Sequence, residues 1–534
     1  MWSPADRRLA APLAALALLL SMVALSRDFG FTWDERFQQK YGEQVWDYLH
    51  GRLPRSDFDT DFANQYLYGG LFELTAVAVQ HAVPADIYVV RHAVNSVFGW
   101  LGIVFCGLLA ARVFGPRAGW LAAGLLAVSP RYFGHSMNNP KDVPFAALSI
   151  AALYVLLTVR PRPPHLTWGH AATLAAVIAL ATNVRPLGLM LLAYTAVVLV
   201  ALSAWAAFRR SSGERLVGGI AGTGAQLLAL ALVAIPAGTL AWPWAQGQPF
   251  TRPIEAFLIA SRASWAGAFG VLYGGEYLAA DRLPWHYVPA WLGMTLPPVV
   301  LVGLALSPLA WRRGTAVRAG LVALGTFALV PIVGAIARHA TLYDGIRHLL
   351  FVVPPLVALA AAGWVAALDA VRGRTRAAAI VVLAVGVAEP FAFQLRNHPN
   401  QVVYFSPIMG GPRAAFGRFD MDYWGNSMLQ AVSWAADQAE RARMPLAVSG
   451  NPRDAVEADA GRFPSVWLTR RWSTTHHLDI RLLRGSHDGV VELANRRDVL
   501  YRATMADGTP LAVVLPGPAY GEVAQQLRLA AGER

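Results

Sequence analysis

The chain has 534 residues, of which 55% are hydrophobic and only 15% are charged. Because soluble globular domains carry roughly 25% charged residues, this composition excludes an ordinary soluble protein and indicates a membrane protein. The formal net charge of +12 does not indicate a nucleic-acid surface, because the arginines lie largely in short loops between apolar segments.

Roughly eleven apolar windows are long enough to cross a bilayer, which takes about 20 helical residues. Their ranges are 9–27, 92–111, 118–134, 143–159, 169–183, 186–207, 216–241, 289–310, 319–337, 347–367 and 377–395. The first window could be mistaken for a signal peptide, but its apolar part is long and no good cleavage site follows, which favours an uncleaved anchor. Cys106, the only cysteine, lies in the second window, so no intrachain disulfide is possible.

The charges of the loops predict how these spans are oriented. Every second loop carries arginines and few acids, from Arg7-Arg8 to the loop at Arg372, as cytoplasmic loops do. The other loops are longer, mixed in charge and rich in aromatic residues, and they are about 28–91, 135–142, 242–288, 338–346 and everything after 396. We therefore expect a cytoplasmic N-terminus and chemistry on the extracytoplasmic face.

Two adjacent acids, Asp34 and Glu35, follow the first predicted span and emerge at a membrane face. A paired carboxylate in this position could activate a hydroxyl beside a lipid-borne substrate, or it could be part of an ordinary hydrated loop. The loop that they open, about 28–91, has apolar residues at helical spacing over 34–50 and 65–82. This spacing predicts two helices that lie along the membrane interface.

The chain uses lysine at only two positions, Lys40 and Lys141, and both lie close to acids in extracytoplasmic loops. In a chain that otherwise uses arginine, a lysine indicates a compact point charge, for instance toward a phosphate, although chance placement is the alternative. Lys141 belongs to the motif Asn139-Pro140-Lys141-Asp142 between two predicted spans.

Aromatic side chains are frequent in the loop 242–288, which also contains Glu276 and His286. Aromatic residues at this depth are usually part of the interfacial belt. They also stack on sugar faces, so contact with a sugar or a lipid tail is the second interpretation, and the two polar residues favour it.

The segment 397–534 is no longer apolar enough for a membrane, and we expect it to form a small extracytoplasmic α/β domain. The pattern predicts a helix over 424–443. It predicts strands over 446–449, 465–468, 489–493, 499–502 and, after the turn Asp507-Gly508, 511–515. The role of this domain is open: it could bind the acceptor or only cap the bundle.

Together these motifs resemble the C-type (GT-C) membrane glycosyltransferase superfamily, in the branch of the protein O-mannosyltransferases and the lipid A aminoarabinose transferase. The resemblance covers roughly residues 1–430. It rests on the acidic pair, the two interfacial helices, Asn139-Pro140-Lys141-Asp142, Tyr343-Asp344-Gly345-Ile346-Arg347-His348-Leu349-Leu350-Phe351-Val352-Val353-Pro354, the stretch 398–407, Gly410-Gly411 and Asp422-Tyr423-Trp424-Gly425. It implies an α-helical polytopic module over 1–396, a polyprenyl-phosphate-linked sugar donor, and inversion at the anomeric carbon.

An inverting transfer from a glycosyl phosphate needs a base on the acceptor hydroxyl and cations on the leaving phosphate. The resemblance assigns the base to Asp34, and Glu35 would orient the acceptor or the base. Candidate donor-phosphate-binding residues, at the predicted outer ends of spans, are Lys141, Arg185, Arg347 and His348. Each of them could instead be an interfacial anchor or the partner of an acid.

Further candidate substrate-binding residues are Lys40, Asp142, Glu276 and His286. The sequence identifies no cofactor with certainty, and a divalent cation could be held by Asp34, Glu35 and Asp142. The expected partners are a lipid-linked sugar, an acceptor that is a glycan, lipid or protein, and the membrane itself. The stretch after residue 398 favours a bacterial plasma membrane.

A transporter or flippase of lipid-linked sugars is the main alternative to a transferase. Such a protein would explain the spans and the aromatic residues. It would place polar residues near the bilayer midplane, often in internal repeats, whereas here acids and cations gather on one side and no convincing repeat is present.

Overall fold

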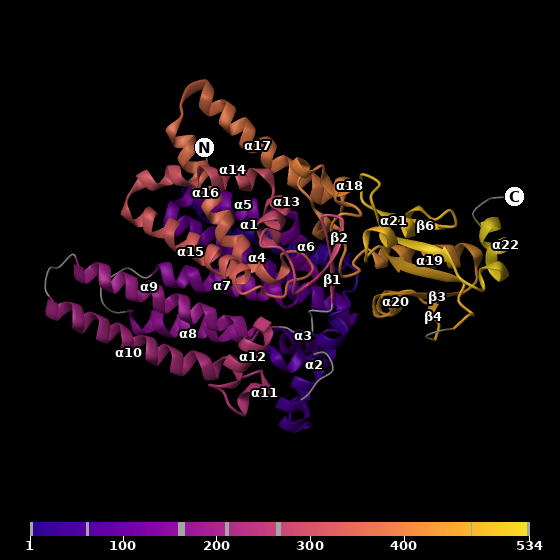
Figure 1. Ribbon diagram of the computed structural model, residues 1–534, viewed down its shortest axis with the longest axis horizontal. Coiled ribbons are helices and arrows are strands. Elements are labelled where there is room, and N and C mark those ends of the chain that lie inside the picture. The colour runs from indigo at the N-terminus through magenta and orange to yellow at the C-terminus, as the bar shows by residue number, and fades with distance from the viewer. Residues whose placement is uncertain are drawn as a thin grey trace.

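The computed structural model describes residues 4–59, 64–158, 166–208, 213–262, 269–470 and 473–530. A bundle of helices makes up most of the molecule, and a small sheet with its own helices lies at one end of it (Figure 1). Helices α2 (Glu35–Leu49) and α3 (Leu71–Ala82) pack against each other between these two parts. Both segments predicted to be helical in the first outer loop contain a helix, the second one beginning at Leu71, while their position along the membrane interface stays a prediction.

The bundle is built around α4 (Ile87–Phe114), which packs against α1 (Pro4–Ser26), α5 (Pro116–Ala127) and α7 (Asp142–Thr158). Its other helices are α6 (Pro130–Asn138), α8 (Trp168–Thr182), α9 (Leu189–Phe208), α10 (Gly213–Ala237), α11 (Pro243–Gln246), α12 (Arg252–Arg262), α13 (Tyr287–Thr295), α14 (Pro298–Leu306), α15 (Thr315–Ala337), α16 (Val353–Ala370) and α17 (Gly373–Arg396).

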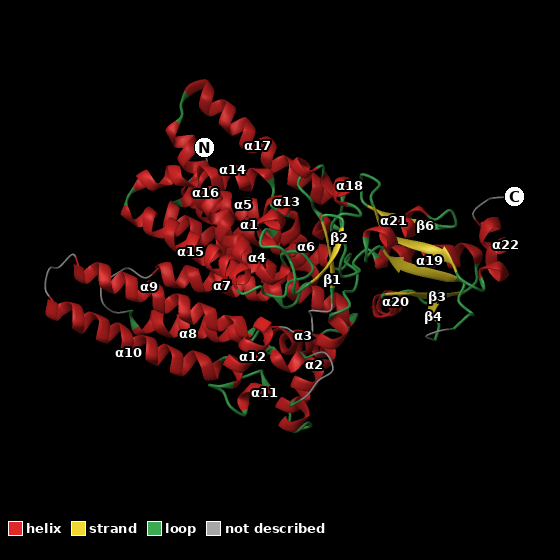
Figure 2. Ribbon diagram, viewed as in Figure 1, coloured by secondary structure: helices red, strands yellow, loops and turns green. Residues whose placement is uncertain are grey.

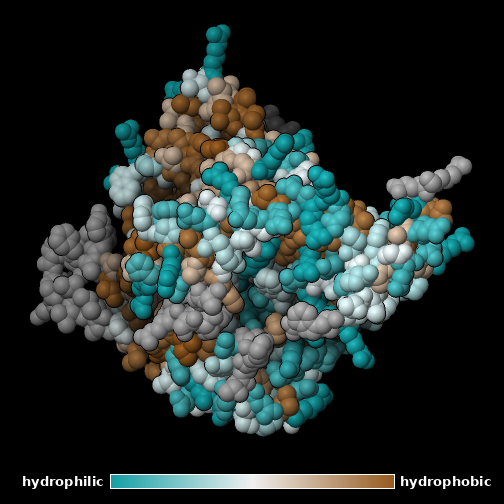
Figure 3. Space-filling model, turned by 45° about the vertical axis from the view of Figure 1, so that its right-hand side comes forward, coloured by the Kyte–Doolittle hydropathy of each residue, from teal (hydrophilic) through white to brown (hydrophobic). Residues whose placement is uncertain are grey.

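The described residues contain five helices that are long and apolar enough to cross a membrane, and up to seven spans if each of two bent pairs counts as one. Three shorter apolar helices, within α1, α8 and α10, accompany them. The chain is thus a multi-pass membrane protein, while the sequence-based number of eleven spans stays a prediction. Large hydrophobic side chains are exposed on α1, α9, α10, α15 and α17, and Figure 3 shows such surface in brown beside the more hydrophilic remainder.

One bent pair determines where polar residues enter the bundle. Helices α6 and α7 meet at an angle of 115° across a break at Asn139, Pro140 and Lys141. Proline lacks a backbone N–H and favours such a break, because it cannot continue the helix hydrogen-bonding pattern. The break places the predicted motif, which is itself largely buried, between the ends of two buried helices rather than inside one.

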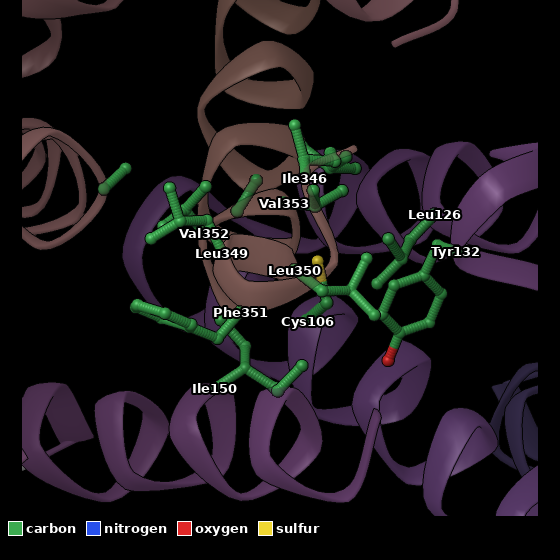
Figure 4. Close-up of a cluster of buried hydrophobic side chains, with 14 of the residues drawn as sticks. Cys106, Leu126, Tyr132, Ile150, Ile346, Leu349, Leu350, Phe351, Val352 and Val353 are labelled. Atoms are coloured by element: carbon green, nitrogen blue, oxygen red, sulfur yellow. The ribbon is translucent and has the colours of Figure 1, made fainter. Parts of the chain in front are cut away.

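The hydrophobic core fixes the position of the segment that begins at Arg347. A 3-10 helix over Arg347–Val352 leads into α16, and most residues of this continuous segment, Arg347–Ala370, are buried inside the bundle. Leu350 lies beside Cys106 and Tyr132, and Phe351 lies beside Ile150 (Figure 4). In a membrane bundle, close van der Waals packing of such side chains holds the helices together. The core therefore determines the position of Arg347, which directly precedes these residues.

The C-terminal part contains a five-stranded mixed sheet in the order β4-β3-β5-β7-β6. Figure 2 shows strands of this sheet in yellow, apart from the red helices of the bundle. Its strands are β3 (Leu446–Asn451), β4 (Val466–Leu468), β5 (Leu478–Leu482), β6 (Tyr501–Thr504) and β7 (Pro510–Pro516). Strand β3 pairs in parallel with both β4 and β5. Strand β7 lies between β5 and β6 and runs antiparallel to both. Helices α19 (Met428–Ala442), α20 (Arg453–Ala460), α21 (His487–Asn495) and α22 (Tyr520–Ala530) accompany it.

One prediction for this part was wrong, and one strand was missed. Residues 489–493 form part of α21 rather than a strand, because Ser486 caps the helix by accepting a hydrogen bond from the backbone N–H of Gly489. Its buried residues, Val490 and Ala494, have helical spacing. Strand β5, in the centre of the sheet, was missed, although its alternation of apolar and charged residues is typical of a half-buried strand.

Candidate functional site

A cavity of about 620 Å³ lies where the bundle, α2 and the C-terminal part meet; we call it the central cavity. It is lined by the start of α2, the α6–α7 break, the hairpin of β1 (Gly270–Tyr273) and β2 (Glu276–Ala279), the loop before α16 and two turns of the C-terminal part. Six sequence-predicted site residues line it: Asp34, Lys141, Asp142, Arg185, Arg347 and His348.

Arg347 lies at the centre of the charges in this cavity. Its Nη1 is 3.9 Å from Oδ2 of Asp34 and 3.7 Å from Oδ2 of Asp142, and its Nε donates a 3.1 Å hydrogen bond to Oδ2 of Asp344. Asp142 also pairs closely with Arg185. The Asp142 and Asp344 side chains are each 1% exposed, so these two carboxylates are enclosed by cations.

Asp34 is different, because 37% of its side chain is exposed and it lines the cavity. Although the side chain is partly open to the cavity, the protein around it removes much of its hydration and so raises the pKa of its carboxyl, against the lowering effect of Arg347 and Lys141. A carboxylate that faces open space and has a raised pKa is suited to accept a proton from a bound molecule.

Lys141 and His348 also line the central cavity, Lys141 as a cation and His348 as a ring that can donate a hydrogen bond. The Lys141 Nζ donates a 2.5 Å hydrogen bond to Oε1 of Gln65 and lies 3.9 Å from the centre of the Tyr68 ring. The His348 ring packs edge-on against Tyr343, with the ring centres 4.6 Å apart. Lysine, two arginines and a histidine thus surround one space, which is an arrangement suited to a phosphate group.

Glu35 is buried behind Asp34 and does not line the cavity. Its Oε2 accepts hydrogen bonds from the backbone N–H and the hydroxyl of Thr32 and lies 3.1 Å from Nε2 of His92. Burial alone would raise the pKa of Glu35, but the charges of His92 and Arg91 and these hydrogen bonds lower it below its ordinary value. The geometry suits Glu35 to holding the turn that presents Asp34.

Three predicted residues are not brought to the cavity. Lys40 is exposed on α2, six positions after Asp34, where the helical rotation of about 100° per residue directs it to another side. Glu276 is exposed on β2, while its neighbour Tyr277 lines the cavity, as alternation along a strand requires. The His286 Nδ1 lies 2.8 Å from the hydroxyl of Tyr273 and does not line the cavity.

Two charged residues of the cavity were missed by sequence reasoning. Asp344 belongs to the quoted segment but was given no role, and Arg484 lies in a turn after the unpredicted strand β5. The Arg484 Nη2 donates a 2.8 Å hydrogen bond to Oδ1 of Asp344. No pattern in the sequence singles out Arg484, because its partner is 140 residues away.

The predicted carboxylates do not fit a shared cation. Arg347 lies between Asp34 and Asp142, and Glu35 is bound to His92 and Thr32. Among the residues that the structure describes, no three His, Cys, Asp or Glu side chains are grouped so as to hold a metal ion.

The turn before Asp34 is held by the C-terminal part of the chain. The Gly30 N–H donates a 3.0 Å hydrogen bond to Oδ1 of Asn426, and the Phe31 N–H donates a 3.2 Å bond to Oδ1 of Asp459. The Arg462 guanidinium donates to the carbonyl of Phe29. The backbone of Phe29, Gly30 and Phe31 is therefore held by hydrogen bonds from the C-terminal part.

We expect Gly30→Ala to destabilise the protein by about 1–3 kcal/mol, since overpacking forces the backbone to move. An added Cβ would lie 2.3 Å from the backbone oxygen of Asn426. Thermal unfolding in detergent measures the change. Gly124→Ala in α5 is the matched control, because nothing lies within 4 Å of its Cβ position. Equal melting temperatures for the two variants would contradict the close approach.

We expect stability to depend on the protonation of Asp459. Burial raises the pKa of this carboxyl to about 7. The folded chain therefore keeps a proton that the unfolded chain loses near pH 4, so this stabilisation is present at low pH and is lost as the pH rises through about 7. The melting temperature of the wild type should therefore fall as the pH rises from about 5 to about 8, and Asp459→Asn should remove this dependence on pH. Asp488→Asn, at an exposed position of α21, should retain it.

The comparisons with known proteins agree with the resemblance noted in the motifs. Residues 88–235 match the family model of the dolichyl-phosphate-mannose-protein mannosyltransferases. The structure of ArnT from Cupriavidus metallidurans bound to undecaprenyl phosphate is similar, with a TM-score of 0.52 and 15% identity over 96% of this chain and 98% of that one. The chain has the fold of the C-type glycosyltransferases. A search of curated sequences finds no match.

A second similar structure is the archaeal oligosaccharyltransferase AglB from Archaeoglobus fulgidus in complex with an inhibitory peptide and a dolichol-phosphate. Its TM-score is 0.49, with 12% identity over 89% of this chain and 70% of that one. Within this C-type glycosyltransferase fold, the matched family segment contains Lys141, Asp142 and Arg185. It contains neither Asp34 nor Arg347, so the roles of those two rest on geometry.

Proposed function

We propose that the protein is an inverting glycosyltransferase that moves a sugar from a polyprenyl-phosphate donor to a hydroxyl or similar acceptor. We further propose that it acts in a bacterial plasma membrane, with the central cavity and residues 397–534 on the extracytoplasmic side. The observation that carries the proposal is one accessible carboxylate, Asp34, facing a cluster of cations in a single cavity.

The geometry supports one reaction in particular. Asp34 accepts the proton of the acceptor hydroxyl, and the acceptor oxygen forms a bond to the anomeric carbon from the side opposite the phosphate. The bond between that carbon and the phosphate oxygen breaks, and its electron pair stays with the phosphate. Arg347 and Lys141 stabilise the resulting negative charge, which is a contribution that grows as the transition state forms.

The surroundings of the cavity also suit a lipid donor. A second cavity of about 290 Å³ shares Tyr68, Arg185, Tyr343 and His348 with the central cavity. This second cavity in turn shares two residues with an apolar groove of about 950 Å³ between α9 and α15. The three spaces adjoin one another, so they lead from the cations to membrane-facing helices.

Such a path fits an amphiphile that has a phosphate head and an isoprenoid chain. The apolar groove takes the chain by hydrophobic burial, and the cations take the head. The similar ArnT structure is bound to undecaprenyl phosphate, which is a molecule of this class. The family model likewise describes enzymes named for a dolichyl-phosphate sugar.

Donor turnover tests the proposal. The purified protein is given a panel of undecaprenyl-phosphate sugars with a membrane extract as the source of acceptors, and the release of undecaprenyl phosphate is quantified. The anomeric configuration of the product is then determined by NMR. Release with an inverted configuration supports the proposal, and a retained configuration contradicts the single displacement. Binding of donors without release from any of them would favour the transporter alternative.

A further inference from the structure

Arg484 of the C-terminal part contacts both sides of the central cavity. Its Nη2 donates to Oδ1 of Asp344 at 2.8 Å, and its Nη1 donates to the backbone carbonyl of Tyr423 at 2.7 Å. Its guanidinium also lies 4.5 Å from the ring centre of Trp33, the residue before Asp34. The side chain is 18% exposed, so these contacts account for most of its surface.

Asp344 transmits this contact to the cation at the centre of the cavity. One carboxylate oxygen accepts from Arg484 and the other accepts from Nε of Arg347. Asp344 has a φ of +58°, a left-handed conformation that non-glycine residues rarely adopt. Such a conformation persists when surrounding contacts hold it, and here two arginines do so.

The charges indicate what happens when Arg484 is removed. A carboxylate that is 1% exposed needs a cationic partner, because an unpaired buried charge is costly. Without Arg484, Asp344 depends on Arg347 alone. Arg347 would then be drawn toward Asp344 and away from the open space near Asp34.

We infer that Arg484 is a positioning residue: by sharing Asp344 it holds Arg347 ready for an anionic group in the central cavity. The C-terminal part is then a component of the site and not only a cap. The placement of Arg347 stands independently of the reaction, whereas the nature of the anion, a lipid phosphate, rests on the proposed function.

The test compares Arg484→Gln with Arg481→Gln. Arg481 is the matched control, since it lies in β5 and pairs with Asp479 at 2.7 Å without lining the cavity. The first readout is the Kd for undecaprenyl phosphate in detergent. Arg484→Gln should weaken binding about tenfold, as coupled pairs do, and Arg481→Gln should leave it unchanged. Arg484→Lys should recover part of the loss, because its ammonium can still pair with Asp344.

A double variant separates positioning from general damage. If Arg484 acts through Arg347, then Arg484→Gln should weaken binding little further in a chain that already carries Arg347→Gln. Fully additive losses would overturn the inference, because Arg484 would then act independently. Equal losses in Arg484→Gln and Arg481→Gln would also overturn it.

Hydrogen exchange of residues 340–347 gives a second readout that needs no donor. These amides should exchange faster in Arg484→Gln than in wild type or Arg481→Gln, since Asp344 in this loop loses its contact with Arg484 and keeps only that with Arg347. If wild type does not bind undecaprenyl phosphate, the proposed donor is wrong and exchange alone decides the inference. Unchanged exchange would overturn the positioning role in either case.

Discussion

Asp34→Asn is expected to lower the turnover of a lipid-linked sugar by about 10²–10⁴-fold, the contribution that a general base usually makes. The amide has nearly the same shape as the carboxylate but cannot accept the proton. Within α2, all of which the structure describes, the Asp34 side chain caps no backbone N–H. The variant should therefore fold normally and bind undecaprenyl phosphate with little change, so that the loss is in kcat.

The control for this experiment is Asp47→Asn on the same helix. Asp47 has the same exposed fraction as Asp34, 37%, but it pairs with Arg52 at 3.0 Å and does not line the central cavity. Release of undecaprenyl phosphate measures turnover in both variants. Equal rates for wild type and Asp34→Asn would contradict the assignment of the base.

The pH profile gives a second check on the same residue. The base must be deprotonated, so kcat/KM should fall on the acid side as the pH drops through the pKa of Asp34. Burial raises that pKa above the ordinary value of 3.8. The acid limb should therefore lie at higher pH than an exposed aspartate would give. Arg347 lowers this pKa, so removal of Arg347 should move any residual acid limb further upward.

Arg347→Gln is expected to cost about 3–5 kcal/mol of stability, because it breaks a buried network of charges. Asp344 and Asp142 each lose one of two cationic partners, and both are 1% exposed. The same change removes a cation from the phosphate, so the Kd for undecaprenyl phosphate should rise at least tenfold. Arg347→Lys keeps the charge and should recover part of the binding, although it lacks the fork that reaches Asp344 and Asp142 together.

Arg396→Gln is the control for this variant, since Arg396 is exposed at the end of α17. Its effect on stability should stay within about 0.5 kcal/mol. Thermal unfolding in detergent and titration with undecaprenyl phosphate supply the two measurements. A melting temperature for Arg347→Gln equal to that of the control would contradict the buried network.

The positions of Asp34, Lys141 and Arg347 could be anticipated because each follows a local rule. Asp34 lies in the loop that follows the first apolar run, Lys141 lies in a proline-containing break, and Arg347 precedes a buried apolar segment. Residues at the ends of apolar segments must lie near a membrane face, since charges are costly inside it. This rule also suggested Lys40, Glu276 and His286, because a loop position does not say in which direction a side chain points.

The amino-acid sequence by itself determined that the chain is a multi-pass helical protein, since the length and apolarity of a segment suffice for that. It also determined which short motifs carry charge. The tertiary structure alone decided that Asp142 and Asp344 are enclosed, that Glu35 lies behind Asp34, and that Arg484 joins the site. These facts depend on contacts between residues far apart in the chain, where packing of the whole molecule, and not local pattern, brings charges together.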